Sequence, residues 1–303
     1  MSTLSTNAFY ANALAGMNAL QTQANTLQAQ IATGNRIQQS SQDPAGAAEL
    51  RSLQQQDALA AVDSANSNTA RTGLNLADNA LTSIVTIVQN IQTLTTQAAS
   101  STVSDSQRAT IGTQIAAYQQ NLVSLANSTD SAGHALFGGE TGGPAYSLDA
   151  SGNATYVGTA NAAQLSLGPG LSVTTGVTGP QVFGFTSNGV SSDLLTLVKS
   201  LATALGSGSG SQGAAQAALG QLSDGLAAVT TAQTVVGARL SWIDTTATLS
   251  TRIGTQRQTE EADIGSTDIT TAVTRLQQVT TALQASQASF VKLAGLSLFN
   301  LIQ

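Results

Sequence analysis

The first 35 residues of the chain alternate apolar and polar positions with the period of a helix. Apolar or small side chains recur at steps of three and four residues, at Tyr10, Ala13, Met17, Leu20, Ala24, Leu27 and Ile31. This spacing forms one apolar stripe, like the a and d positions of a coiled coil. It predicts a helix over about residues 5–33, which Gly34 and Asn35 are suited to end.

The C-terminal end repeats the same spacing. Its stripe consists of Ala272, Leu276, Val279, Leu283, Ser286, Phe290 and Leu293. The first 35 residues carry no charged side chain, and after Gly265 only Asp268, Arg275 and Lys292 are charged. Because each stripe can cover the other, we expect the two terminal helices to pair. Their nearly uncharged outer faces are unusual for a surface helix and leave room for further partners.

Longer helices are predicted between the two ends. Asp43 and Pro44 supply an N-cap and a proline at the first helical position, which starts a helix over about residues 44–99. Ser104 and Gln107 have the spacing of a capping box and predict a helix to about residue 125. Residues 193–205 and about 214–253 also read as helical, the latter from a stripe at Leu219, Leu222, Leu226, Val229, Val236, Leu240 and Ile243.

Residues 134–190 have a different character, because they are rich in Gly, Thr, Val and Ser and contain three of the four prolines. Residues 154–157, 164–167 and 171–174 read as short strands between glycine turns. Residues 206–213 read as a Gly/Ser hinge. The fold class is therefore mainly α, a long antiparallel coiled-coil rod of N- and C-terminal segments with a small inserted β domain.

The nested order of these segments predicts three domains. Residues 1–42 with 265–303 form a terminal coiled-coil domain for assembly, and residues 43–133 with 191–264 form a helical rod. Residues 134–190 form the inserted β-rich domain.

Composition favours a subunit of an assembly. Charged residues make up 9% of the 303 residues, against roughly 25% in an average soluble protein. A polar but uncharged surface avoids the cost of burying ions when copies pack together. Ten Lys and Arg without a cluster argue against nucleic acid as a partner. We expect no membrane span, because no apolar run reaches 18 residues, and we see no secretory signal of the cleaved type.

Residues able to support catalysis are few. His134 is the only histidine and the chain has no cysteine, so a metal site built on His or Cys is not expected. Glu260, Glu261 and Asp263 form one acidic cluster, which reads as a solvated helix face or a contact between subunits. Gly208, Gly210 and Gly213 fit a dinucleotide-binding spacing, but no strand precedes them, so a linker is favoured. We therefore predict no catalytic, cofactor or metal residues, and no enzyme.

Several segments resemble bacterial flagellins and their relatives. Residues 31–50, IATGNRIQQSSQDPAGAAEL, are similar to the family's L-x-T-G-x-R-I…S-x-D-D-P-A-G-A region, although Gln42 replaces its first acidic residue. Residues 283–303 resemble the family's terminal helix. HALFGGET at residues 134–141 and the ending SLFNLI resemble the branch that forms the junction between the flagellar hook and filament.

The resemblance implies a structural subunit joining the hook to the filament. It implies export through the flagellar type III apparatus by an uncleaved signal, a cytoplasmic export chaperone, and an extracellular location. Expected partners are other copies of the chain and neighbouring hook-associated and flagellin subunits. The terminal helices would fold on assembly. We expect the assembly interface at Tyr10, Met17, Leu20, Leu27, Ile31, Leu276, Leu283, Phe290, Leu293, Leu298 and Phe299.

Two other functions stay open. A flagellin that forms the filament itself would share the terminal helices and the export route. A secreted adhesin or carbohydrate-binding module would use aromatic residues of the insert, where only Tyr146, Tyr156, Phe183 and Phe185 are available.

Overall fold

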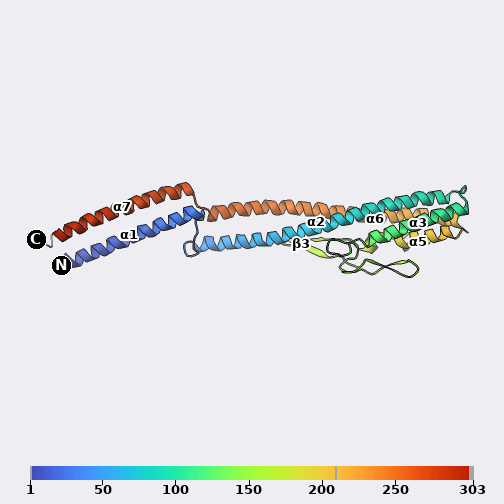
Figure 1. Cartoon of the computed structure of the whole chain (residues 1–303), viewed down its shortest axis with the longest axis horizontal. Helices are drawn as coiled ribbons and strands as arrows, with labels where there is room; N and C mark the ends of the chain where they lie inside the picture. Colours follow the sequence, from blue (N-terminus) through green and yellow to red (C-terminus); the bar gives the residue numbers. More distant parts are fainter. Residues whose placement is uncertain (1, 209, 300–303) are drawn as a thin grey trace. The chain divides into compact units, whose positions relative to one another are not determined.

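The structure is a computed structural model that describes residues 2–208 and 210–299, with side chains for residues 8–208 and 210–293. Within these residues it has seven helices and six short strands (Figure 1). The predicted mainly α fold with a small β insertion is confirmed. Two compact units are present, Met1–Ala58 with Arg252–Gln303 and Leu59–Thr251. Helices α2 (Pro44–Ala99) and α6 (Ser211–Gly265) contribute residues to both units.

The first unit contains the terminal helices, α1 (Ser2–Thr33) and α7 (Ile269–Phe299). These two helices lie side by side, although they come from opposite ends of the chain (Figure 1). Their shared core is small and consists of Ala24, Leu27, Ala272 and Val279, with Leu20, Ile31 and Leu276 packed against it. The core residues all belong to the two predicted stripes, so the stripes face each other as expected.

The second unit has a larger core. Helices α3 (Asp105–Ala126) and α5 (Leu194–Gly206) pack against each other. In the second half of α2, apolar residues at helical spacing are wholly buried in this core, at Leu74, Ala77, Leu81, Ile84, Val88 and Ile91. The core also takes in Ile115 and Leu122 from α3 and Leu222 from α6. A period of 3.6 residues therefore located the buried face of each long helix correctly.

Side-chain caps fix where several helices begin. Ser104 and Gln107 form the predicted capping box at the start of α3, with Ser104 N donating to Gln107 Oε1 at 3.0 Å. Asp43 caps α2, because its Oδ1 accepts from Gly46 N at 2.9 Å. Asp193 caps α5 by accepting from the backbone N–H groups of Leu195 and Thr196. Each cap satisfies backbone donors that a helix leaves free at its first turn.

The insert consists of three antiparallel hairpins and one short helix, α4 (Gly179–Phe183). The hairpins pair β1 (Tyr146–Leu148) with β2 (Ala154–Tyr156), β3 (Gln164–Gly168) with β4 (Leu171–Thr174), and β5 (Gly184–Ser187) with β6 (Val190–Asp193). Strands β2, β3 and β4 were predicted, whereas β1, β5 and β6 were not.

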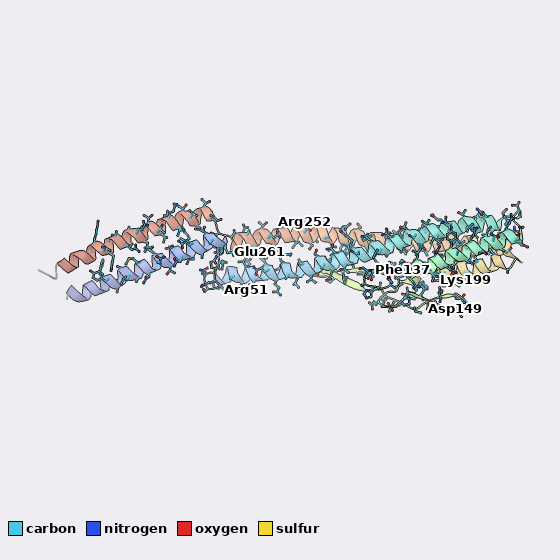
Figure 2. All side chains as sticks on the ribbon, viewed as in Figure 1. Arg51, Phe137, Asp149, Lys199, Arg252 and Glu261 are labelled. Atoms are coloured by element: carbon cyan, nitrogen blue, oxygen red, sulfur yellow. The ribbon has the colours of Figure 1, made fainter. Side chains whose placement is uncertain are left out.

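An aromatic cluster holds the insert together. Tyr146 packs edge-on against Phe183 and Tyr156, and Phe137 packs edge-on against Phe183. Phe137 is fully buried, whereas Asp149 is exposed at the β1–β2 turn (Figure 2). Aromatic pairs in this geometry contribute beyond their buried area.

The predicted hinge is shorter than expected. Gly206 closes α5 and α6 already starts at Ser211, so Gly213 lies inside a helix. Gly208 and Gly210 have positive φ angles of 77° and 71°. Glycine adopts such angles without steric cost, which suits both residues to the tight turn between α5 and α6.

Candidate assembly surface

The two stripes bring predicted interface residues of both termini together. Leu27 is buried, and Leu20, Ile31 and Leu276 pack around it. Near the other end of the pair, the ring of Tyr10 lies 5.4 Å from the ring of Phe290, edge-on at 79°. Within this chain, these predicted residues therefore contact each other.

The remaining predicted residues have different environments. Met17 and Leu283 are half-buried, while Leu293 is 46% exposed. A groove of about 420 Å³ runs along the pair, lined in part by Phe9, Gly16, Met17, Ser286, Phe290 and Leu293. Leu298 and Phe299 were also predicted, but their side chains lie outside the described residues.

The outer faces of α1 and α7 combine exposed apolar residues with uncharged polar ones. Phe9, Leu14, Val273 and Val291 are all at least 37% exposed. Between them lie Asn, Gln, Thr and Ser, and α1 has no charged residue. Such a surface loses little free energy of ion hydration when another protein covers it. Its chemistry fits contact with protein.

A polar joint closes the unit where α1 meets α2 and α6 meets α7. Asn35 and Ser266 form an antiparallel bridge, in which Arg36 N donates to Gly265 O and Thr267 N donates to Gly34 O. The Arg36 guanidinium donates through Nε and Nη2 to Ile264 O, at 3.0 and 2.7 Å.

Arg36 also reaches the cap of α2. Its Nη2 lies 3.1 Å from Asp43 Oδ2. The Gly46 N–H and then Arg36 hold the pKa of Asp43 below its usual value. Asp43 and Pro44 were predicted only as a helix start, so sequence reasoning identified the cap but missed the role of Arg36.

Helix α7 begins with a similar cap. Asp268 Oδ1 accepts from Thr270 N and Thr271 N, and Oδ2 accepts from the Thr271 hydroxyl. The Thr271 side chain and backbone lower the pKa of Asp268. Both helices that leave the joint therefore start on a charged aspartate, which a helix N-terminus favours.

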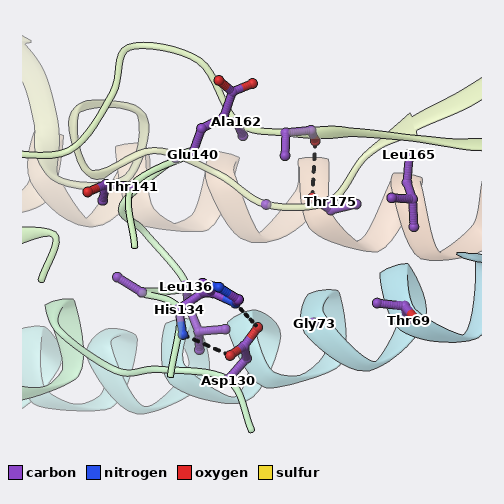
Figure 3. Close-up of a pocket in the computed structure, with 14 residues that line it drawn as sticks. Thr69, Gly73, Asp130, His134, Leu136, Glu140, Thr141, Ala162, Leu165 and Thr175 are labelled. Carbon is purple, nitrogen blue, oxygen red and sulfur yellow. Dashed lines mark hydrogen bonds and ion pairs between the residues drawn. The ribbon is translucent and has the colours of Figure 1, made fainter. Parts of the chain in front are cut away.

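His134 lies at a separate cavity of about 330 Å³ in the second unit (Figure 3). Asp130 Oδ1 accepts from the backbone N–H groups of Ala132 and His134, and His134 Nδ1 is 3.5 Å from Asp130 Oδ2. Burial acts to raise the pKa of Asp130, but the N–H groups of His134 and Ala132 outweigh it and lower the pKa. These contacts shape the loop after α3.

The other candidate catalytic or metal-binding residues do not form a common site. Within the described residues, no group of His, Cys, Asp and Glu is placed to hold a metal ion. Glu260 and Asp263 are exposed, and Gly208 and Gly210 belong to the α5–α6 turn. Among the described helices, none combines the length and apolar character needed to cross a bilayer.

Comparison with known proteins shows what the chain resembles. Residues 4–141 match the model of the bacterial flagellin N-terminal helical region. The chain is 27% identical to flagellar hook-associated protein 3 of Escherichia coli over 90% of both chains. It is 27% identical to flagellar hook-associated protein 3 of Salmonella typhimurium, over 98% of this chain and 99% of that protein.

The chain is therefore similar to the bacterial flagellin N-terminal region over residues 4–141, and to hook-associated proteins over at least 90% of its length. It is also 30% identical to a B-type flagellin of Pseudomonas aeruginosa, over 46% of its own length and 29% of that flagellin.

Solved structures share the fold of this chain. FlgL of Xanthomonas campestris matches with a TM-score of 0.62 and 17% identity, over 68% of this chain and 98% of that one. Flagellar hook-associated protein 3 of Legionella pneumophila matches with a TM-score of 0.64 and 15% identity, over 71% of this chain and 99% of that one. At these identities the match establishes the fold.

Proposed function

We propose that this chain is a structural subunit that joins the hook of the bacterial flagellum to its filament. The observation that carries the proposal is the extent of the matches. Two hook-associated proteins match over at least 90% of both chains, whereas the B-type flagellin matches over 46% of this chain and 29% of its own length. Insert, rod and termini are therefore all included in the resemblance to hook-associated proteins.

The proposed mechanism is assembly through the terminal helices. Ordering a residue costs about 1–2 kcal/mol of backbone entropy, and apolar burial returns about 25 cal/mol per Å². Among the side chains that the structure describes, the α1–α7 core has four buried residues, Ala24, Leu27, Ala272 and Val279. This small core supports a pair that gains most of its stability when neighbours cover its outer faces. The proposed interface is the set of residues predicted above, nine residues of the two stripes together with Leu298 and Phe299.

The proposal includes a domain division and a route. Residues 1–42 with 265–303 would assemble, residues 43–133 with 191–264 would form the rod, and residues 134–190 would form the insert. The chain would be exported unfolded through the type III apparatus, after a cytoplasmic chaperone has held its termini, and would function outside the cell. Its partners would be further copies and neighbouring hook-associated and flagellin subunits, and it would not act as an enzyme.

The carbohydrate-binding alternative is disfavoured by the insert. Sugar binding needs aromatic rings that solvent can reach, but Tyr146, Phe183 and Phe185 are buried in the core and Tyr156 packs on Tyr146. The alternative that the chain is a flagellin forming the filament itself predicts a different phenotype of a deletion strain, so an experiment distinguishes it from the proposed function.

The decisive experiment is electron microscopy of a strain that lacks the gene. We expect hooks without attached filaments and filament protein released into the medium, with attachment restored by the intact gene. Filaments that stay on the hooks would contradict the proposal. A strain with neither attached filaments nor released filament protein would instead indicate the filament subunit.

A further inference from the structure

The terminal helix pair has few means of setting its own register. In coiled coils, register is usually set by charged pairs beside the seam or by a polar residue within it. Helix α1 has no charged residue, and no ion pair joins the described parts of the two helices, residues 8–33 and 269–293.

The hydroxyl groups of the pair form hydrogen bonds within their own helices. Thr22 and Thr26 of α1 donate to the carbonyl four residues earlier, and so do Thr274 and Thr281 of α7. The Gln21 amide donates to Asn25 on the same helix. Because apolar stripe positions recur in both helices, a slip by one heptad would again place apolar residues opposite apolar residues.

The polar joint, by contrast, fixes one point of the pair. The bridge between Asn35 and Ser266 places one residue of each connection opposite the other. The Arg36 side chain then links the last turn of α6 to the first turn of α2, through Ile264 O and Asp43. A planar guanidinium that donates in several directions fixes geometry more strictly than an apolar contact does.

The register of the joint continues to the far end of the pair. Tyr10 lies 25 residues before Asn35, and Phe290 lies 24 residues after Ser266, yet their rings are in contact. Two antiparallel helices that start together at the joint and rise equally per residue would meet at these positions. The observed pairing is therefore the one that the joint dictates.

We propose that Arg36 is a positioning residue that sets the register of the α1–α7 pair, with Asp43 as its anchor. The uncharged seam supplies attraction, and the joint supplies alignment. This division leaves the outer face of α1 free of charge and that of α7 with only Arg275 and Lys292 in its described part, while the pair keeps one alignment. The inference concerns contacts within one chain and does not depend on the proposed function.

Cross-linking tests the proposal directly, because the chain has no cysteine. Met17→Cys with Leu283→Cys reports the observed register, since both positions continue the alignment of Tyr10 with Phe290. Met17→Cys with either Leu276→Cys or Phe290→Cys reports a slip of one heptad, which moves the helices by about 10 Å. A short bifunctional maleimide is applied to the full-length chain at low concentration, so that intramolecular products dominate.

With Arg36 present, we expect the Met17–Leu283 product to exceed the slipped products at least tenfold. Arg36→Ala should reduce that ratio to within threefold of one. Asp43→Asn keeps an acceptor for Gly46 N but removes the ion pair, and should lower the ratio to an intermediate value. Arg275→Ala removes a cation of α7 outside the joint and should leave the ratio unchanged.

Loss of pairing would by itself bring the ratio closer to one, because an unpaired chain cross-links all three pairs at similar rates. Leu27→Ala, which weakens the seam but leaves the joint intact, measures that effect, and Arg36→Ala should lower the ratio further. An effect of Arg36→Ala no larger than that of Leu27→Ala would overturn the proposal. An unchanged ratio in Arg36→Ala would overturn the proposal, as would equal products with Arg36 present. Absence of any product in the chain with Arg36 would also overturn it, because the joint would then not align the helices. None of these outcomes bears on filament attachment, which tests the proposed function separately.

Discussion

At the scale of single residues, Arg108 is a buried cation whose contacts join two helices. It is 6% exposed and donates to Ala98 O and Ser100 O, both at 2.9 Å, and to Asp105 Oδ1 at 2.8 Å. The two carbonyls lie at the end of α2, where a helix leaves acceptors without partners. Arg108 thus ties the end of α2 to the start of α3.

Replacing Arg108 tests this role. Arg108→Met keeps much of the packing volume but leaves the carbonyls of Ala98 and Ser100 without their donor. We expect the free energy of unfolding to fall by about 2–4 kcal/mol, measured by chemical denaturation. The control is Asp105→Asn, which should cost less than about 1 kcal/mol because Asp105 is 67% exposed. Equal losses of unfolding free energy in the two variants would show that the stability comes from the ion pair and not from the carbonyl contacts.

At the scale of elements, sequence periodicity located helices better than strands. The bounds of α2 were predicted to the residue, because Asp43-Pro44 marks its start and a long stripe marks its face. Strand β6 was missed because Val190–Asp193 shows no apolar alternation. A signal was present nonetheless, since Asn188-Gly189 is typical of a two-residue hairpin turn and has φ angles of 51° and 77°.

The joint was missed for a different reason. Arg36 was part of a recognised motif, but its acceptor is a backbone carbonyl 228 residues away, at Ile264. Any residue type offers the same carbonyl, so no pattern of side chains marks the partner. The apolar stripes, in contrast, could be predicted from the sequence because the contacting residues of both helices recur at steps of three and four.

Close packing in the aromatic cluster of the insert predicts that an added side-chain atom at the start of α4 lowers stability. A Cβ added at Gly179 would lie 2.6 Å from Tyr146 Oη and 2.7 Å from Cδ2 of the Tyr156 ring. Gly179→Ala should therefore lower the free energy of unfolding of the insert by about 1–3 kcal/mol, measured by denaturation with near-ultraviolet circular dichroism. Gly142→Ala is the matched control, because nothing lies within 4 Å of its added Cβ.

A second substitution identifies the atom responsible. Tyr146 Oη is buried and has no hydrogen-bond partner in the described structure. Tyr146→Phe removes this atom at little cost and should restore part of the stability lost in Gly179→Ala. If the double variant were no more stable than Gly179→Ala, the clash would lie with Tyr156 instead.

At the scale of the whole molecule, the two compact units should respond separately to damage. Residues Leu59–Thr251 contain the large core, and the terminal unit has its own small core around Leu27. Leu20 and Leu283 are half-buried members of the terminal seam. Leu20→Asp with Leu283→Asp places two like charges in that seam, at a cost that a core of four buried residues does not offset.

We therefore expect the double variant to lose filament attachment and motility while its middle unit stays folded. The measurements are swimming in soft agar, microscopy of attached filaments, and the thermal unfolding midpoint of the purified chain. Leu148→Asp is the control, since Leu148 is 55% exposed on β1 and should tolerate the charge. Normal motility in the double variant would refute the role of the seam in filament attachment. A lowered unfolding midpoint of the unit Leu59–Thr251 would show instead that the two units are energetically coupled. The loss of attachment could then not be assigned to the terminal seam.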